Sequence, residues 1–190
     1  MTFDTLESAA VLFGIVSVYL SVRENIWSWP TAIVNVTLYI FVFYRARLYA
    51  DMSLQVVYIG ISLYGWYEWL HGGRGKSRLA VSRGTRRLSL LLTGIGVVAA
   101  AVLGTLLARY TNAALPYLDS TTTTTSLIAQ WMMARKILEN WLVWVAVDVV
   151  YIGMFVYKSL ILTAGLYAVF LVLSLMGYFR WRRSLGQDPS

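Results

Sequence analysis

Seven long apolar segments, separated by short polar connections, constrain the fold of this chain more than any other feature of its sequence. They cover residues 6–22, 30–44, 52–70, 88–108, 122–137, 141–157 and 160–179. A helix needs about 20 predominantly apolar residues to cross a bilayer, so a chain of 190 residues has room for seven crossings and little else. The sequence therefore predicts an all-α membrane protein with seven transmembrane helices.

The scarcity of charge supports this prediction and excludes most soluble functions. Charged residues make up 13% of the chain and hydrophobic residues 58%, whereas a soluble domain carries about 25% charged residues. The chain has no cysteine, which excludes disulfides, thiolate nucleophiles and cysteine-ligated metals. Its net charge of +7 is spread over loops and does not form the basic stripe of a nucleic-acid-binding surface.

Catalytic motifs are also missing from the sequence. The single histidine, His71, lies in a basic loop, and no serine–histidine–aspartate set, zinc-protease motif or phosphate-binding loop accompanies it. Only one carboxylate, that of Asp148, falls well inside an apolar segment. We therefore expect neither enzymatic activity nor a bound cofactor or metal ion.

The fifth segment is the least regular, because residues 121–125 are consecutive threonines. Threonine hydroxyls can bond to carbonyl groups one turn earlier in a membrane helix. We therefore assign this segment as a helix, although hydrophobicity does not define its ends.

The distribution of Lys and Arg predicts how the chain crosses the membrane. If the loop at residues 71–87 is cytoplasmic, the inner side holds Arg23, Arg74, Lys76, Arg78, Arg83, Arg86, Arg87, Arg135, Lys136, Arg180, Arg182 and Arg183. The outer side then holds only Arg45, Arg47, Arg109 and Lys158. Because basic loops resist translocation, we expect a bacterial cytoplasmic-membrane protein with its N-terminus outside and its C-terminus inside. The basic loop is interpreted as a solvated segment that directs this topology.

The sequence repeats itself with an offset of 112 residues. This offset pairs Trp29 with Trp141, Tyr39 with Tyr151, Phe43 with Phe155, Trp69 with Trp181, and Ser62-Leu63-Tyr64-Gly65 with Ser174-Leu175-Met176-Gly177. The chain is therefore interpreted as two three-helix repeats, at residues 1–70 and 121–190. Residues 71–120 supply the basic loop, a linking helix and an outer loop.

One linking helix between two three-helix units gives both units the same direction in the membrane. The repeats are thus expected to be parallel, in a 3+1+3 arrangement about an axis along the membrane normal. Parallel repeats of this kind hold a substrate near the middle of the bilayer, and rocking of the halves exposes it to each side in turn. The alternative is that the duplication only stabilises a helix bundle.

The sixth segment carries the strongest candidate for a functional site. Trp141, Trp144, Asp148 and Tyr151 share one helical face, and Asn140 precedes them. An ionised carboxylate inside a membrane is costly, so it is expected to face the bundle interior or a wet cavity. A cation over a tryptophan ring gains about 2 kcal/mol when desolvated, so this face would suit a flat cationic ring. The alternative for Asp148 is a structural hydrogen bond to a hydroxyl or indole group.

Polar side chains on other segments can complete this site. Asn35, Gln55, Tyr58 and Gln130 fall within the second, third and fifth segments. Amide groups inside a membrane either bond helices together or bind a polar ligand. Their convergence with Asp148 predicts a cavity that offers hydrogen bonds to a small polar molecule.

Tryptophans near the ends of predicted helices are interpreted as anchors at the membrane interface; they are Trp27, Trp66, Trp69 and Trp181. Gly65 and Gly177 occupy matched positions near the inner ends of the third and seventh segments. Small residues there permit close helix packing or bending during gating.

Aromatic and polar motifs recur along both halves of the chain: Trp27-Ser28-Trp29-Pro30, Asn35, Leu48-Tyr49-Ala50-Asp51, Leu54-Gln55, Tyr64-Gly65-Trp66-Tyr67, Glu139-Asn140-Trp141-Leu142-Val143-Trp144, Asp148, Tyr151 and Tyr157-Lys158. Together these motifs resemble those of the PnuC-type vitamin transporters. The resemblance implies a SWEET-like 3+1+3 fold, commonly homotrimeric, that carries nicotinamide riboside inward by facilitated diffusion. It also implies a substrate site between the halves, formed by Asn140, Trp141, Trp144 and Asp148 with Asn35, Gln55 and Gln130.

The family has thiamine and riboflavin branches as well, so the substrate does not follow from the resemblance alone. Nicotinamide riboside and thiamine both carry a cationic ring, whereas riboflavin is neutral and larger. Ribose hydroxyls and a carboxamide favour a site with several amides, so nicotinamide riboside is the expected substrate and thiamine the alternative. A membrane substrate-binding subunit without a transport cycle is the second alternative.

Overall fold

The computed structural model describes residues 3–45, 47, 49–111, 115–157, 159 and 161–185. Within these residues the chain forms seven α-helices and one short 3-10 turn. They are α1 (Phe3–Val22), α2 (Ser28–Arg45), α3 (Tyr49–His71), the turn Arg74–Lys76, α4 (Arg86–Tyr110), α5 (Pro116–Ala134), α6 (Asn140–Tyr157) and α7 (Ile161–Ser184). The prediction of an all-helical chain with seven helices is confirmed.

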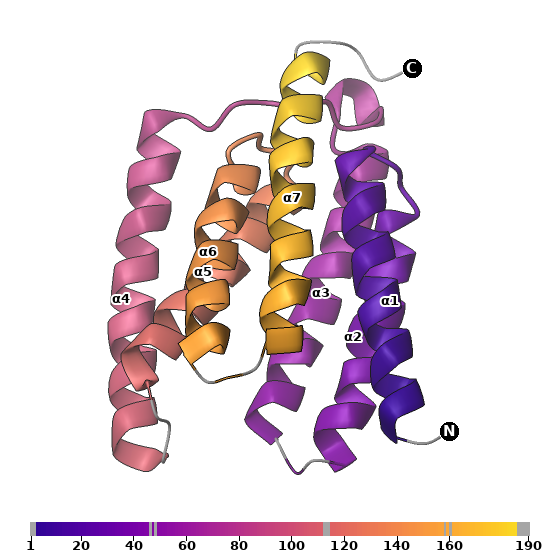
Figure 1. Cartoon of the computed structure of the whole chain (residues 1–190). Helices are drawn as coiled ribbons and strands as arrows, with labels where there is room; N and C mark the ends of the chain where they lie inside the picture. The colour runs from indigo at the N-terminus through magenta and orange to yellow at the C-terminus, as the bar shows by residue number, and fades with distance from the viewer. Residues whose placement is uncertain are drawn as a thin grey trace.

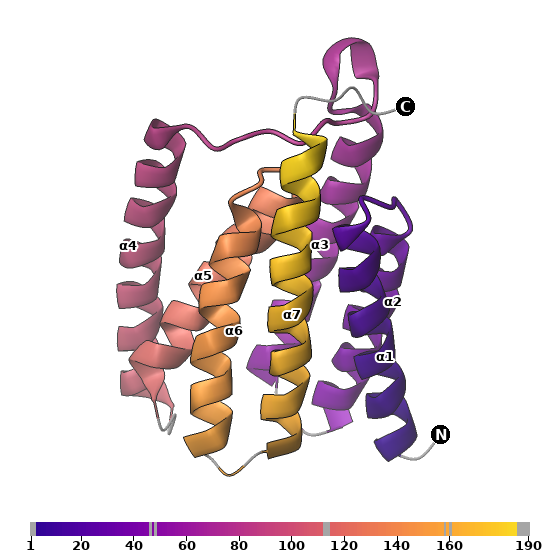
Figure 2. The same cartoon turned by 45° about the horizontal axis from the view of Figure 1, so that its top comes forward.

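The helices stand side by side and alternate in direction (Figure 1). α1 begins at the lower end of the view and α7 ends at the upper end, so α1–α3 and α5–α7 both run up, down, up. α4 lies at one side and packs mainly on α5, while the two triplets meet where α1 contacts α7 and α3 contacts α5. The loop between α3 and α4 crosses the same end of the bundle at which α7 ends (Figure 2).

Four of these helices are long and apolar enough to cross a membrane by length and composition. The qualifying stretches are Thr5–Val22, Arg86–Tyr110, Asn140–Tyr157 and Thr163–Ser184. α2, α3 and α5 fall short because amide, hydroxyl and charged side chains interrupt their apolar sequence. Four helices could therefore each cross a membrane, whereas α2, α3 and α5 carry more polar side chains along their length.

The fifth helix starts earlier and ends earlier than the predicted range 122–137. Pro116 occupies its first turn, where a missing N–H costs nothing. The hydroxyls of Thr121, Thr122 and Thr124 donate to carbonyls four residues earlier, at 2.7, 3.0 and 2.8 Å, which confirms the expected role of the threonines. The helix ends before Lys136, whose φ of 48° lies in the left-handed region.

The 112-residue offset also relates backbone features. α2 and α6 each contain 18 residues, and their first and last residues differ by 112 positions. Glu24 and Lys136, which follow α1 and α5, both have positive φ, at 54° and 48°. Arg47 and Ser159, which follow α2 and α6, repeat this match at 58° and 59°. Both triplets therefore turn their chains in the same way at the same positions.

Four tryptophans form the centre of the hydrophobic core and are called the tryptophan cluster: Trp29, Trp69, Trp141 and Trp181. Trp29 meets Trp69, and Trp141 meets Trp181, each edge to face with ring centroids 5.3 Å apart. Trp69 and Trp181 are 5.8 Å apart and join the two pairs.

The interpretation of Trp69 and Trp181 as membrane-interface anchors is wrong, because they are only 3% and 0% exposed. Each donates its indole N–H across the bundle to the opposite triplet. Trp69 donates to the Met133 carbonyl at 3.1 Å, and Trp181 donates to the Ser21 carbonyl at 3.0 Å. Trp27, which is 65% exposed, agrees with the anchor interpretation.

Gly65 and Gly177 create the space into which two of these indoles pack. A Cβ atom added at Gly65 would overlap the ring of Trp29, and one added at Gly177 would lie 2.5 Å from the ring of Trp141. Both glycines thus permit close packing, in matched positions of the two triplets. This packing is the simpler of the two roles expected for them.

Alanine at Gly177 is expected to destabilise the fold by about 1–3 kcal/mol, because overpacking a rigid indole forces backbone or rotamer shifts. The matched control is Gly165→Ala in the same helix, where a Cβ would meet no atom within 4 Å and alanine favours the helix. Thermal unfolding in detergent measures both, and Gly65→Ala with Gly60→Ala repeats the comparison in α3. Equal melting temperatures for Gly177→Ala and Gly165→Ala would contradict the packing role.

Candidate functional site

A cavity of about 440 Å³ lies between the two helix triplets. Its lining residues come from α1, α2 and α3 on one side and from α5, α6 and α7 on the other. This volume falls in the range of small-molecule sites, about 300–1,000 Å³. The lining begins with Trp29 and Trp141 at the upper end of the bundle. It reaches Phe43, near the end of α2, and Asp51, near the start of α3, at the lower end.

The cavity brings together most of the residues that the sequence singled out. Eight of the nine candidate substrate-binding residues line it: Asn35, Gln55, Tyr58, Gln130, Trp141, Trp144, Asp148 and Tyr151. Asn140 does not line it. That side chain is fully buried and donates to the Ile137 carbonyl at 2.6 Å, at the start of α6. Direct contact of Asn140 with a substrate stays a prediction that this conformation does not support.

Asp148 faces the cavity from α6 and is only 2% exposed. Ser174 of α7 donates its hydroxyl to Asp148 Oδ2 at 3.1 Å. The structural alternative for Asp148, a hydroxyl partner, is therefore present. A single hydroxyl leaves the other carboxylate oxygen available, since an ionised carboxylate can accept several hydrogen bonds.

Asn35 serves a structural contact at the same time as it lines the cavity. Its Nδ2 donates to the Ala10 carbonyl of α1 at 2.6 Å. The amide therefore ties α2 to α1, as amides do inside membranes. Its carbonyl oxygen is the part that can accept a hydrogen bond from a ligand.

Several buried polar groups of the cavity lining have no protein partner within the described part of the chain. They are the indole N–H groups of Trp29, Trp141 and Trp144 and the hydroxyls of Ser28 and Ser62. A buried polar group without a partner costs about 1–3 kcal/mol. Around this cavity they are donors that a polar ligand or water can satisfy.

Aromatic rings cover the lower part of the cavity. Tyr151 and Tyr167 lie with ring centroids 4.6 Å apart, and Phe170 lies 5.9 Å from Tyr167. On the opposite triplet Tyr39 stacks on Phe43 at 5.6 Å. A flat ring can enter between such surfaces by stacking.

Sequence reasoning missed Tyr167, Phe170 and Ser174 as cavity residues. The repeat carried a signal for them, because the 112-residue offset pairs these three positions with Gln55, Tyr58 and Ser62. Within an apolar segment, however, an aromatic residue is more often part of the core than of a site.

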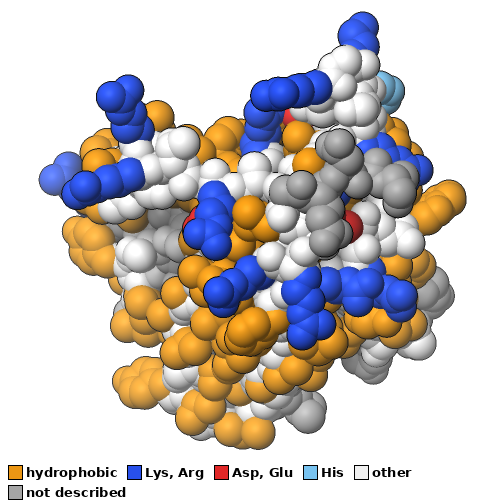
Figure 3. Space-filling model, turned by 90° about the horizontal axis from the view of Figure 1, so that it is seen from above, with side chains coloured by type: hydrophobic (Ala, Val, Ile, Leu, Met, Phe, Trp, Pro, Cys, Tyr) orange, Lys and Arg blue, Asp and Glu red, His pale blue; other side chains and the backbone are white. Residues whose placement is uncertain are grey.

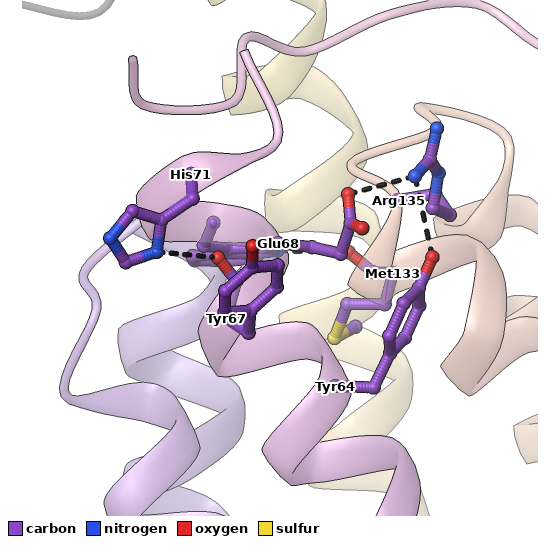
Figure 4. Close-up of polar contacts among 7 residues, drawn as sticks. Tyr64, Tyr67, Glu68, His71, Met133 and Arg135 are labelled. Atoms are coloured by element: carbon purple, nitrogen blue, oxygen red, sulfur yellow. Dashed lines mark hydrogen bonds and ion pairs between the residues drawn. The ribbon is translucent and has the colours of Figure 1, made fainter. Parts of the chain in front are cut away.

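The upper end of the cavity is closed by contacts between the triplets. Lys136, 5% exposed at its side chain, pairs with Glu24 at 3.0 Å and lies 4.7 Å from the centroid of the Trp69 ring. Arg135 pairs with Glu68 at 2.7 Å and donates to the Tyr64 hydroxyl at 3.3 Å (Figure 4). These ion pairs and the tryptophan cluster join both triplets at one end of the bundle.

Lys and Arg side chains gather around this closed end (Figure 3). The basic residues predicted for the inner side are carried by loops and helix termini that all lie at this end of the bundle. α2 ends at the opposite end of the bundle with Arg45, and α4 ends there just after Arg109. Lys158, predicted to lie on that side, falls outside the described residues.

A cavity lined by aromatic, amide and carboxylate side chains between two helix triplets can hold a small molecule. The model of the family described as "Nicotinamide mononucleotide transporter" matches residues 4–183. The chain belongs to this family, which consists of membrane transporters and not of enzymes.

Curated relatives include transporters of two vitamins. The chain is 27% identical to the nicotinamide riboside transporter PnuC of Escherichia coli (strain K12), over 97% of this chain and 88% of that protein. It is 25% identical to the riboflavin/roseoflavin transporter RibM of Streptomyces davaonensis, over 90% of this chain and 81% of that protein. The crystal structure of the vitamin B3 transporter PnuC superposes with a TM-score of 0.74 at 27% identity, over 95% of this chain and 81% of that chain. The expected membership of the PnuC-type family is confirmed.

Proposed function

We propose that this protein takes up nicotinamide riboside by facilitated diffusion through alternating access. The observation that carries the proposal is the cavity between the triplets, where Trp144, Asp148 and three amide side chains meet. Similarity to nicotinamide riboside transporters supports the substrate.

The chemistry of the cavity suits this substrate. The pyridinium ring of nicotinamide riboside is flat and cationic, so it can stack on the Trp144 indole and be attracted by Asp148. The ribose and carboxamide need hydrogen-bonding partners when they leave water, and Gln55 and Gln130 offer them from opposite triplets. In this arrangement both triplets bind one substrate molecule.

The transport cycle rests on a parallel 3+1+3 architecture of seven transmembrane helices. It is supported by the shared up, down, up order of the triplets and by the matching left-handed residues 112 positions apart. The hydrogen bonds of Trp69 and Trp181 are also related by the repeat. Each indole donates to a carbonyl of the opposite triplet, and the two acceptor residues, Ser21 and Met133, are 112 positions apart. Rocking of the triplets about the cavity would expose it alternately to the two sides.

Membrane orientation follows from the basic end of the bundle. Because basic segments stay in the cytoplasm, the closed end faces the cytoplasm of a bacterial inner membrane, with the N-terminus outside and the C-terminus inside. Substrate then enters from the outer side, and separation of the cytoplasmic contacts releases it inward. The family resemblance further suggests a homotrimer, in which the largely uncovered α4 has room for a neighbouring subunit.

Riboflavin is a second candidate substrate because RibM is a relative, and thiamine stays an alternative because its thiazolium is also cationic. A substrate-binding subunit without transport would share the cavity. It would differ by never releasing substrate on the other side of the membrane.

Trp144→Ala is expected to weaken nicotinamide riboside binding about 30-fold, because a desolvated cation over an indole gains about 2 kcal/mol. Calorimetric titration of the purified protein with nicotinamide riboside, thiamine and riboflavin measures the affinity for each and identifies the preferred vitamin. Trp27→Ala removes a highly exposed indole outside the cavity and serves as the matched control. Preferred binding of riboflavin, or an unchanged affinity of Trp144→Ala, would overturn the proposed substrate or its site.

A further inference from the structure

The loop between α3 and α4 is packed onto the protein and is not the free solvated segment that the sequence suggested. Leu79 donates its N–H to the Trp69 carbonyl at 3.2 Å, and the buried Val81 joins the hydrophobic core. Ser82 donates to the Lys136 carbonyl at 3.0 Å and accepts from the Leu138 N–H at 2.9 Å. A segment that only directs topology by charge needs no such attachment.

The attached loop borders a second, open cavity of about 760 Å³ at the basic end of the bundle. One wall is basic and carries Arg74, Arg78 and Arg83 from the loop. The other wall is largely aromatic and aliphatic, with Tyr64 from α3 and Trp131 from α5. This second cavity is separate from the proposed substrate site, because the two share no lining residue.

The lining of this cavity is positively charged. It includes Arg74, Arg78, Arg83 and Arg135 and no Asp or Glu among the described residues. Within the described part of the chain, neither Arg74 nor Arg83 forms an ion pair with a carboxylate. The carboxylate of Glu139 accepts from the Gly84 backbone N–H at 2.8 Å, so it holds the loop in place. The cavity is therefore prepared for an anion from outside the protein.

The position of the cavity indicates what kind of anion it meets. Its lining includes Tyr64 of α3 and Leu88 of α4, and Leu88 begins the apolar surface of α4. Leu90, Leu91 and Ile95, further along that helix, are 65%, 59% and 52% exposed. Tryptophan and tyrosine concentrate at the level of lipid headgroups, and basic pockets between helices on the cytoplasmic side bind anionic headgroups.

We propose that this second cavity binds a phosphate ester through Arg74 and Arg83, and that the phosphate belongs to an anionic phospholipid of the leaflet at the basic end. Arginine offers a planar set of donors that matches phosphate geometry. The lipid would brace the loop against α4 and α5 and thereby fix α4 relative to the triplets. This inference does not depend on which vitamin the protein carries.

The test compares two double variants with the same loss of charge, one in the loop and one at the start of α4. Arg74→Gln with Arg83→Gln changes the cavity wall, whereas Arg86→Gln with Arg87→Gln changes residues that do not line the cavity. Each full-length protein is purified in neutral detergent and titrated with phosphatidylglycerol and with phosphatidylcholine. Bound lipid is counted by native mass spectrometry, and the melting temperature is recorded at each lipid concentration.

The cavity variant is expected to lose about 30-fold in affinity for phosphatidylglycerol, because about 1 kcal/mol per arginine near anionic lipid adds up to about 2 kcal/mol for the pair. The control variant, whose arginines do not line the cavity, is expected to lose clearly less. A parallel titration with inorganic phosphate separates the two sources of phosphate. Phosphate that stabilises the wild type but not the cavity variant, with no preference for phosphatidylglycerol, supports the site and assigns it to a soluble phosphate ester. Equal lipid and phosphate binding by both variants overturns the proposal.

Discussion

Asp148→Asn is expected to lower nicotinamide riboside uptake into liposomes roughly 30-fold at low substrate concentration, while leaving the protein folded. Loss of a charge from a desolvated ion pair costs about 2 kcal/mol or more, which corresponds to roughly 30-fold in affinity. Asparagine has nearly the same shape, and its carbonyl oxygen can still accept the hydroxyl of Ser174, which lies 3.1 Å from Asp148 Oδ2. The loss should therefore appear as weaker binding of the cationic ring.

Asp119→Asn is the matched control, because Asp119 lies in the first turn of α5 and does not line the cavity. Both variants should melt within a few degrees of the wild type. Uptake by Asp148→Asn equal to that of Asp119→Asn would show that the carboxylate does not recognise the substrate. A melting temperature lowered only in Asp148→Asn would instead assign it the structural role.

Chemical cross-linking between positions 24 and 136 is expected to stop uptake almost completely. Glu24 and Lys136 join the triplets at the basic end through a 3.0 Å ion pair, and alternating access requires them to separate. The chain contains no cysteine, so the variant with Glu24→Cys and Lys136→Cys carries the only two thiols. A short, reducible bifunctional thiol reagent would hold this end closed.

Uptake should return when the cross-link is reduced, and each single-cysteine variant treated with the same reagent serves as a control. Cross-linked protein should still bind substrate from the outer side, because the cavity lining extends to the opposite ends of α2 and α3. Full uptake by the cross-linked protein would mean that this contact is not part of the gate.

Hydrophobicity alone predicted the ends of a helix well where charged residues or a turn follow the apolar segment. The sixth segment, predicted at residues 141–157, is α6 at Asn140–Tyr157. α5 deviated because its threonines bond within the helix, which hydrophobicity does not register. α7 continues to Ser184, beyond the predicted residue 179, because arginines at a helix end can extend it into water.

The residue types of the site could be predicted, but the direction of individual side chains could not. Asp148 and the amides had to face the interior because lipid cannot accommodate them. A tryptophan near a helix end can face either lipid or the bundle, so Trp69 and Trp181 were misjudged. Asn140 is the first residue of the helix that carries Asp148, yet its amide donates back to the Ile137 carbonyl and it lies outside the cavity.

Counterflow in sealed liposomes tests alternating-access transport most directly. Vesicles that contain the protein are loaded with unlabelled nicotinamide riboside and diluted into a trace of radiolabelled substrate. We predict a transient accumulation of label inside, which exceeds the outside concentration without any ion gradient. Label that binds to the protein but never accumulates would contradict a transport cycle and favour a binding subunit.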